Sequence, residues 1–266
     1  SNPFAGHYEP YGEQNLAIFD RYFPVDGNIN RFFSPADLTA VRDPIFQQEL
    51  ARSPYRNVMR VPYTAFFAPG ASCEVTPQNE AALLAQVTET VRACRGKLYG
   101  IEIFNEPHLW RITSGPDAGK RTMDAGKVAY LLQKIAPAVK AIDPDIQIFG
   151  PVGGLGYDKY FEEFIAAGGA QVIDALDFHS YNTDPDAEDT AGQIRRLKAM
   201  FAGAAGKDIP AYNTEVYYGV RNTPVINSDD ETERSYFRDD ELPHAALMTS
   251  MLIHHAVNRV GVCNYM

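Results

Sequence analysis

The feature of this sequence that most constrains its fold is an alternation of short β-rich runs with amphipathic helical stretches, beginning at about residue 57. The β-rich runs cover residues 57–63, 98–104, 146–149, 175–181, 209–216 and 260–265. Between them, apolar residues recur every three or four positions, as they do on a helix that buries one face. The alternation predicts an α/β domain in which helices connect parallel strands.

Six strands in this order favour a (β/α)8 TIM barrel over an open, doubly wound sheet. A nucleotide-binding sheet lacks its main support, because no G-x-G-x-x-G follows the first run and the chain has no P-loop. A complete barrel takes roughly 250 residues, or about 31 for each strand and its helix. The chain has 266 residues, and we expect one catalytic barrel domain over residues 1–266.

The N-terminal part is expected to depart from the barrel pattern. Residues 1–56 must supply two strand–helix units, yet their helical periodicity is weak and prolines stand at positions 3, 10, 24, 35, 44 and 54. We predict that this part is irregular or divergent and wraps over an incomplete barrel. The chain stops directly after its last β-rich run, so the last helix is also expected to be missing. The strand edges thus exposed would be covered by the N-terminal segment or by a second copy in a homo-oligomer.

Two glutamates follow β-rich runs at places suited to catalysis. Asn105 and Glu106 end the run at 98–104 and are followed at once by a proline. Glu215 lies near the end of the run at 209–216, three strand–helix units later. Barrel enzymes hold their active sites where the strands end, so both carboxylates are expected at one rim, facing each other across the mouth.

A facing pair of carboxylates is what glycoside hydrolysis requires. One carboxyl group protonates the leaving oxygen, and the other attacks the sugar or activates a water molecule. A retaining enzyme needs about 5 to 5.5 Å between the two groups, whereas an inverting enzyme leaves roughly 6.5 to 9.5 Å for the water. Either glutamate alone is equally well explained as a strand end that meets solvent, but two of them in equivalent places favour chemistry.

Three motifs resemble those of the clan A glycoside hydrolases. Residues 102–108 are similar to the acid/base strand, in which Asn-Glu-Pro closes the fourth strand of the barrel. Residues 177–181 resemble the end of the sixth strand, often His-x-Tyr, and residues 213–215 resemble the nucleophile strand, the seventh. The resemblance covers about residues 57–266. Within the clan, the stretch 149–181 looks most like family 39, whereas Arg-Val-Pro in the first run is similar to family 5.

The resemblance implies a retaining glycosidase that acts by double displacement on a β-linked, mainly neutral glycan. Glu106 would be the acid/base, and Glu215 would be the nucleophile that forms the glycosyl-enzyme. Asn105 would donate a hydrogen bond to the 2-hydroxyl of the sugar.

His179, Tyr181 and Asp177 alternate along one strand, so all three can face the barrel interior. In the clan, residues at such positions orient the nucleophile and contact the sugar. A hydrogen-bonded core histidine beside a packed tyrosine is the plainer alternative. Glu106, Asp177 and His179 are also of the types that ligate divalent ions. The chain has no H-x-H or H-E-x-x-H spacing, however, and we expect neither a metal nor another cofactor.

Four further residues are candidates for substrate binding: Arg60, His108, Trp110 and Tyr217. Arg60 resembles the arginine beside the nucleophile in family 5, but too few residues separate it from Glu106 for two complete units, so a structural salt bridge is the alternative. Trp110 and Tyr217 lie in the loops after the two catalytic strands, where they would stack on sugar faces or pack at the rim. His108 lies in the same loop as Trp110.

Charge and composition argue against nucleic acid and a membrane span, so the carbohydrate that the resemblance implies is the expected partner. With 24 basic and 34 acidic side chains, the formal net charge is −10, which argues against nucleic-acid binding. No run approaches the roughly 20 apolar residues of a membrane span. No signal peptide opens the chain, but a tag remnant at Ser1-Asn2 would hide its removal, and we expect a secreted or periplasmic protein.

Two alternatives stay open. Cys73 and Cys94 form a disulfide if the native compartment is oxidising, or else they and Cys263 are buried thiols. The barrel hydrolyses its glycan, or it is a catalytically impaired barrel that binds carbohydrate, because a misalignment of about 1 Å is enough to cost catalysis.

Overall fold

A computed structural model of the protein describes residues 29–33, 38–52, 56–61, 75–110, 123–181, 186, 189–216 and 250–262. These residues form one seven-stranded sheet, in which each strand pairs in parallel with the next strand along the chain. The strands are β1 (Ile29–Phe33), β2 (Arg56–Arg60), β3 (Gly100–Glu102), β4 (Gln147–Gly154), β5 (Ala175–Ser180), β6 (Ala211–Val216) and β7 (Val260–Val262). The last six coincide with the six β-rich runs, so the predicted strands are confirmed.

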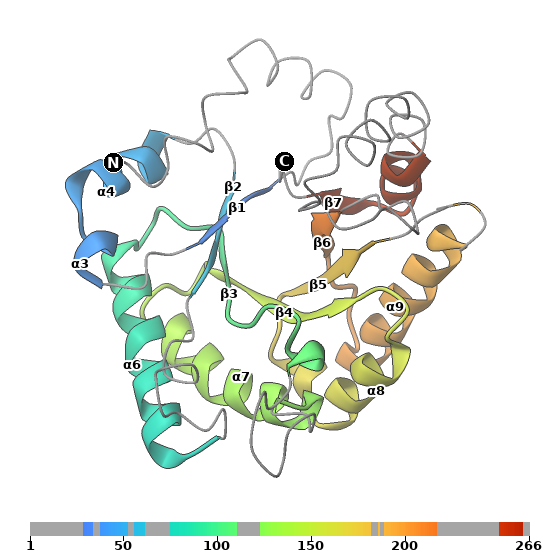
Figure 1. Ribbon diagram of the computed structural model, residues 1–266, viewed down its shortest axis with the longest axis horizontal. Coiled ribbons are helices and arrows are strands. Elements are labelled where there is room, and N and C mark those ends of the chain that lie inside the picture. The colour runs from blue at the N-terminus through green and yellow to red at the C-terminus, as the bar shows by residue number, and fades with distance from the viewer. Residues whose placement is uncertain are drawn as a thin grey trace, which may run out of the picture.

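Helices connect the strands and lie on the outer face of the curved sheet (Figure 1). They are α3 (Leu38–Val41), α4 (Pro44–Arg52), α6 (Pro77–Ala93), α7 (Ala125–Lys140), α8 (Asp158–Ala166) and α9 (Thr190–Ala205), with short helices η1 (Pro107–Leu109) and η2 (Gly169–Gln171). Residues 250–257 are also helical and precede β7. Parallel strands in chain order with helices outside are the arrangement of a (β/α) barrel. Among the described strands β1 and β7 have one neighbour each, so this part of the chain is a partial barrel.

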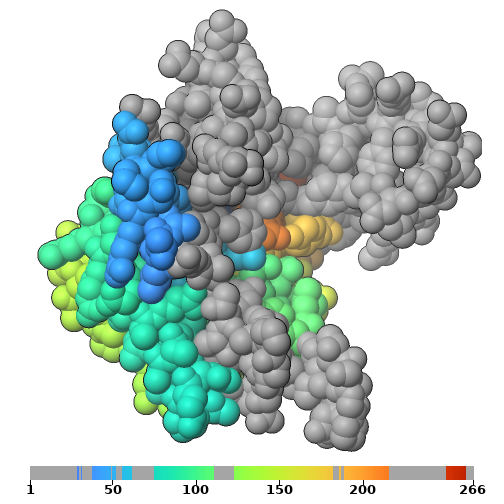
Figure 2. Space-filling view, turned by 60° about the vertical axis from the view of Figure 1, so that its left-hand side comes forward, coloured from blue at the N-terminus to red at the C-terminus, as the bar shows by residue number. Residues whose placement is uncertain are grey.

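The expectation of irregular structure over residues 1–56 is wrong for the described part of that range. β1 pairs with β2, with Ile29 opposite Arg56, and α3 and α4 follow β1. The prolines were misleading, because Pro44 is the first residue of α4. At that position a missing N–H costs no hydrogen bond, and the fixed φ of proline suits a helix. In the space-filling view, α3 and α4 (blue) lie against α6 (teal) on the outer surface (Figure 2).

Local sequence explains where the longer helices begin. Thr76 Oγ1 accepts a hydrogen bond from Asn79 N ahead of α6, and Asp124 Oδ1 accepts one from Lys127 N ahead of α7. Such caps satisfy N–H groups that have no partner within the helix. None of the helices in the described residues is long and apolar enough to cross a membrane.

Apolar side chains pack on both faces of the sheet. The larger cluster lies between the sheet and the helices and includes Ile148 and Leu176. Their neighbours Phe149 and Ala175 belong to a second cluster on the interior face, because successive side chains of a strand alternate. Cys94 lies in the larger cluster as a free thiol whose Sγ accepts a hydrogen bond from Gln47 Nε2, which excludes the disulfide alternative for this cysteine. Cys73 and Cys263 lie outside the described residues.

Candidate active site

The candidate site lies inside the curve of the sheet, where the strands end. Ile29, Ala175 and Tyr212 belong to the interior apolar cluster. The residues two positions later on each strand face the same way, because the side-chain period of a strand is two. Those residues are polar and buried: Arg31, Asp177 and Thr214. The interior therefore changes from apolar to charged toward the carboxyl ends of the strands.

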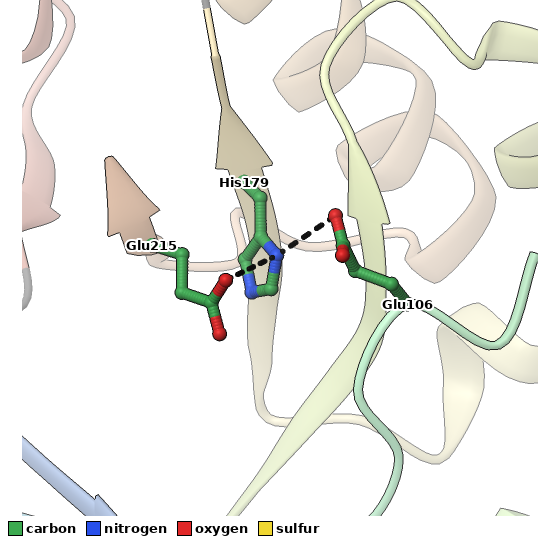
Figure 3. A group of neighbouring side chains, drawn as sticks. All are labelled: Glu106, His179 and Glu215. Carbon is green, nitrogen blue, oxygen red and sulfur yellow. Dashed lines mark ion pairs between the residues drawn. The ribbon is translucent and has the colours of Figure 1, made fainter. Parts of the chain in front are cut away.

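Glu106 and Glu215 face each other at this end, with the His179 ring between them (Figure 3). His179 Nδ1 lies 3.2 Å from Glu106 Oε1 and 3.6 Å from Glu215 Oε2. One carboxylate oxygen of each glutamate and one ring nitrogen of His179 all lie within 4.8 Å of one another. The fold thus brings together three residues that the sequence motifs singled out.

Glu106 has a left-handed backbone conformation, with φ 46° and ψ 48°. This conformation is uncommon for a residue with a Cβ atom and costs of order 1–3 kcal/mol. The following turn holds it in place: Pro107 begins η1, and Leu109 N donates to Glu106 O at 2.9 Å. Strained residues of this kind gather at functional sites.

The strand that carries Glu215 contains a one-residue irregularity. On β5 and β6, Phe178 pairs with Asn213. The next residue of β5, His179, pairs with Glu215 rather than with Thr214. Thr214 is therefore an extra residue of β6, as in a β-bulge, and bulges re-aim side chains next to active sites.

The bulge allows two consecutive side chains of β6 to reach the same interior. Thr214 Oγ1 donates to Asp177 Oδ1 at 2.6 Å. Glu215 Oε1 accepts a hydrogen bond from Arg31 Nη1, also at 2.6 Å. In a regular strand these neighbouring side chains would point to opposite faces of the sheet.

Arg31 is the site residue that the sequence motifs missed. Its Nε and Nη2 donate to the two oxygens of Glu102 at 2.6 and 2.5 Å, and Nη1 donates to Glu215. The Arg31 side chain is 1% exposed. Arg60, the predicted arginine, has its Nη1 3.9 Å from Glu215 Oε1 and is also at the site. The sequence signal for Arg31 was its place among apolar residues in the run 29–33. The surrounding prolines made that run hard to recognise as a strand.

The surroundings of Glu215 favour its ionised form. Burial works against ionisation, yet the pKa of Glu215 lies below its ordinary value, because the His179 ring, when protonated, and the Arg31 guanidinium place positive charge beside the carboxylate. Hydrogen bonds from Tyr181 and Arg31 add to this lowering of the pKa. The Tyr181 hydroxyl donates to Glu215 Oε2, and burial together with this bond raises the pKa of Tyr181, so its proton stays in place.

Asn105 and Trp110 are tied to the same network. Arg31 Nη2 donates to Asn105 Oδ1 at 2.7 Å, and an arginine can only donate, so the amide oxygen must face it. Trp110 Nε1 donates to Asn105 O at 2.9 Å, and the indole packs edge-on against Phe104 with ring centroids 5.8 Å apart. Trp110 therefore braces the backbone of Asn105, and its predicted stacking on a sugar stays a prediction.

The two other predicted contacts have different outcomes. His108 is buried, and its ring lies 4.4 Å from that of Tyr157 and 5.2 Å from that of Tyr160. It supports Tyr157, which is half-exposed, and its own contact with substrate stays a prediction. Tyr217 lies outside the described residues.

A metal suits this site poorly. The ligand-type atoms that converge belong to Glu106, His179 and Glu215, whereas Asp177 Oδ1 is held by Thr214. Both oxygens of Glu215 already accept hydrogen bonds, one of them from a buried arginine that a cation would have to displace. The donors present therefore fit a pair of acting carboxyl groups better than a metal centre.

Solved structures of glycoside hydrolases resemble this chain. BuGH86 in complex with neoagarooctaose has a TM-score of 0.60 at 15% identity, over 92% of this chain and 48% of that chain. A Paenibacillus polymyxa xyloglucanase from glycoside hydrolase family 44 has a TM-score of 0.55 at 14% identity, over 86% and 59% of the two chains. A glucosidase from Croceicoccus marinus has a TM-score of 0.58 at 13% identity, over 94% and 54%.

Likeness at these identities shows a shared fold, which is the fold expected from the resemblance to clan A. The chain spans about half to three fifths of the length of these three structures. No family model matches the sequence, and no curated protein matches it.

Proposed function

We propose that the protein is a glycoside hydrolase that cleaves β-glycosidic bonds in a mainly neutral oligo- or polysaccharide by a retaining double displacement. The observation that carries the proposal is the facing pair Glu106 and Glu215, with one oxygen of each within 4.8 Å of the other. This spacing supports retention, because an inverting pair leaves roughly 6.5–9.5 Å for a water molecule.

In the first step, ionised Glu215 attacks the anomeric carbon while Glu106 gives its proton to the glycosidic oxygen. The C–O bond to the leaving group breaks, and a glycosyl ester on Glu215 forms. Arg31 and Tyr181 hold the two oxygens of Glu215, which fixes the direction of attack. In the second step, water attacks the anomeric carbon, Glu106 takes the proton of that water, and Glu215 leaves as a carboxylate.

Asn105 has a defined part in both steps. Its Oδ1 accepts from Arg31, so Nδ2 is the amide atom left to donate to the 2-hydroxyl of the sugar. That contact strengthens as the ring gains oxocarbenium character, which lowers the barrier rather than merely binding the substrate.

The proposal is tested with Glu106→Gln and Glu215→Gln on a panel of polysaccharides and aryl β-glycosides. We expect each variant to lose about 10²- to 10⁴-fold in kcat/KM, the usual worth of acid–base and nucleophilic groups. The matched control is Glu163→Gln on α8, an exposed carboxylate paired with Lys159, which leaves activity unchanged. Full activity in either site variant contradicts the proposal.

Three further measurements separate the alternatives. A 2-fluoro glycoside should leave a sugar ester on Glu215, detected by mass spectrometry, whereas its absence in an active enzyme points to inversion. Saturable glycan binding with no hydrolysis of any substrate favours the impaired, carbohydrate-binding barrel. Activity that a chelator abolishes and a divalent metal restores favours a metal centre at Glu106, His179 and Glu215.

A further inference from the structure

Thr214 and Asp177 are buried and have no part in the proposed reaction, and they form a chain of contacts on the Nε2 side of His179. Thr214 Oγ1 lies 3.1 Å from His179 Nε2, and the same hydroxyl donates to Asp177 Oδ1 at 2.6 Å. Asp177, Thr214 and His179 are each fully buried. The chain of contacts runs from the core to the rim, where His179 Nδ1 lies 3.2 Å from Glu106 Oε1.

The direction of the hydroxyl proton decides which ring nitrogen is protonated. A threonine hydroxyl has one proton and gives it to one acceptor. Asp177 Oδ1 takes that proton, at the shorter of the two contacts, so Thr214 Oγ1 faces His179 Nε2 as an acceptor. Nε2 must then carry a hydrogen, and in a neutral imidazole the other nitrogen, Nδ1, has the lone pair.

The surroundings of Nδ1 agree with this assignment. Nδ1 is buried and makes no hydrogen bond within the described residues, and the nearest oxygens are Glu106 Oε1 at 3.2 Å and Glu215 Oε2 at 3.6 Å. A lone pair there can accept from the protonated carboxyl group of Glu106.

Asp177 fixes the direction of the hydrogen bond between Thr214 and itself, in which the threonine hydroxyl is the donor. Its carboxyl group faces that of Glu102, which is already paired with Arg31. Burial and the charge of Glu102 raise the pKa of Asp177 well above its ordinary value. A side-chain hydrogen bond with Glu102 also raises this pKa, and because Oδ1 accepts from Thr214, Oδ2 is the oxygen left to carry the proton of that bond. Oδ1 therefore stays an acceptor.

We propose that Thr214 and Asp177 are positioning residues that hold His179 in its Nε2–H tautomer, with the Nδ1 lone pair turned toward Glu106. The inference rests on the proposed function, because it concerns the hydrogen bond available to Glu106 as the proposed acid. The tautomer decides whether the ring nitrogen beside Glu106 accepts a hydrogen bond or donates one. The bulge at Thr214 makes this possible, since it turns Thr214 and Glu215 into the same interior.

The tautomer is measured directly by ¹⁵N NMR of protein labelled at histidine. The chain has six histidines, and the His179 signals are identified by their loss in His179→Asn. In the unmodified protein we expect a protonated Nε2 and a bare Nδ1. Thr214→Val removes the hydroxyl while keeping the shape, and should abolish this pattern. Thr214→Ser keeps the hydroxyl and Asp177→Asn keeps an acceptor oxygen, so both should retain it.

Kinetics provide the second readout. We expect Thr214→Val to lower kcat by about 10- to 100-fold with little change in KM, a part of the roughly 10²- to 10⁴-fold worth of acid–base catalysis. Thr214→Ser should stay within about threefold of the unmodified protein. A bare Nε2 in the unmodified protein, or an unchanged His179 pattern in Thr214→Val, overturns the inference.

The NMR arm does not depend on hydrolysis, so the two proposals can fail separately. A pattern that is lost in Thr214→Val and kept in Thr214→Ser, in a protein that cleaves no glycoside, would support the assigned contacts and contradict the proposed function. If Thr214→Val does not fold, the tautomer of the unmodified protein and of Asp177→Asn still decides the assignment.

Discussion

Arg31 dominates the charge balance of the interior at the scale of single residues. One guanidinium binds both the buried Glu102 and the partly exposed Glu215, and Arg60 Nη1 adds a second positive charge 3.9 Å from Glu215 Oε1. A third carboxylate, Asp177, lies in the same space and is raised in pKa by burial and by Glu102. This direction favours the neutral acid, because two adjacent buried carboxyl groups cannot both be ionised cheaply.

The raised pKa of Asp177 predicts an unusual effect of Asp177→Asn on stability. Above its ordinary pKa of about 3.9, Asp177 is ionised in the unfolded chain, whereas in the folded protein it keeps its proton to higher pH. The unmodified protein therefore loses stability as pH rises through this window, by up to about 1.4 kcal/mol per pH unit, and the variant does not. Urea unfolding at pH 4, 5.5 and 7 should show the variant gaining on the unmodified protein.

A matched control for this prediction is Asp174→Asn. Asp174 forms a salt bridge with Lys140 at 2.8 Å and accepts a hydrogen bond from Ile148 N, so its charge is useful to the folded state. The control removes these contacts and should be less stable than the unmodified protein at pH 5.5 and 7, with no gain on it as pH rises. If Asp177→Asn behaves in the same way, Asp177 is ionised in the folded protein and the prediction is wrong.

At the scale of elements, the helical residues 250–257 are hydrogen-bonded to β6 just before its bulge. His255 Nδ1 bonds to Met251 O at 2.6 Å, so its Nε2 accepts from Asn213 Nδ2 at 2.7 Å. Asn213 Nδ2 also donates to Ser180 Oγ on β5 at 2.6 Å. The strand that carries Glu215 is thereby held from its outer side by one neutral histidine.

This contact predicts a loss of stability in mild acid. Burial lowers the pKa of His255 from 6.5 to about 4, so the folded protein resists a proton that the unfolded chain accepts. The resulting stability is complete above pH 6.5 and decreases as pH falls, by about 2.5 kcal/mol at pH 4.5. Urea unfolding at pH 7 and 4.5 measures it, with His255→Gln expected to lack this part of the loss. The control His254→Gln, at the exposed pair with Asp186, should keep it.

At the scale of the whole molecule, the net charge of −10 acts on any substrate that approaches the candidate site. Surface potentials of this kind repel like charges over about 30 Å at 0.01 M salt and about 10 Å at 0.1 M. We expect kcat/KM for a carboxymethylated polysaccharide to rise at least about threefold between these salt concentrations. The neutral parent polysaccharide should show no such rise, and an equal response of both would contradict a field effect.

The sequence alone was enough to predict six of the seven described strands and three residues of the site. Alternating periods of two and 3.6 mark strands and helices locally, and parallel strands must end at one edge, which places Glu106, His179 and Glu215 together. β1 escaped prediction because five residues between prolines are too short for a clear period. Arg31, which donates a hydrogen bond to Glu215, was missed for the same reason, because it lies on β1.

The chain's local patterns thus establish an α/β sheet with a polar, carboxylate-bearing end, because periodicity and motif spacing depend on neighbours along the sequence. Contacts between distant residues decide which charge meets which carboxylate, where the bulge lies that turns Glu215 inward beside Thr214, and how far the pKa of Asp177 is raised. Arg31 and Glu215 are 184 positions apart, and no local pattern pairs them. Such contacts arise only when the sheet curls, since its curvature brings β1 across the interior toward the ends of β3 and β6.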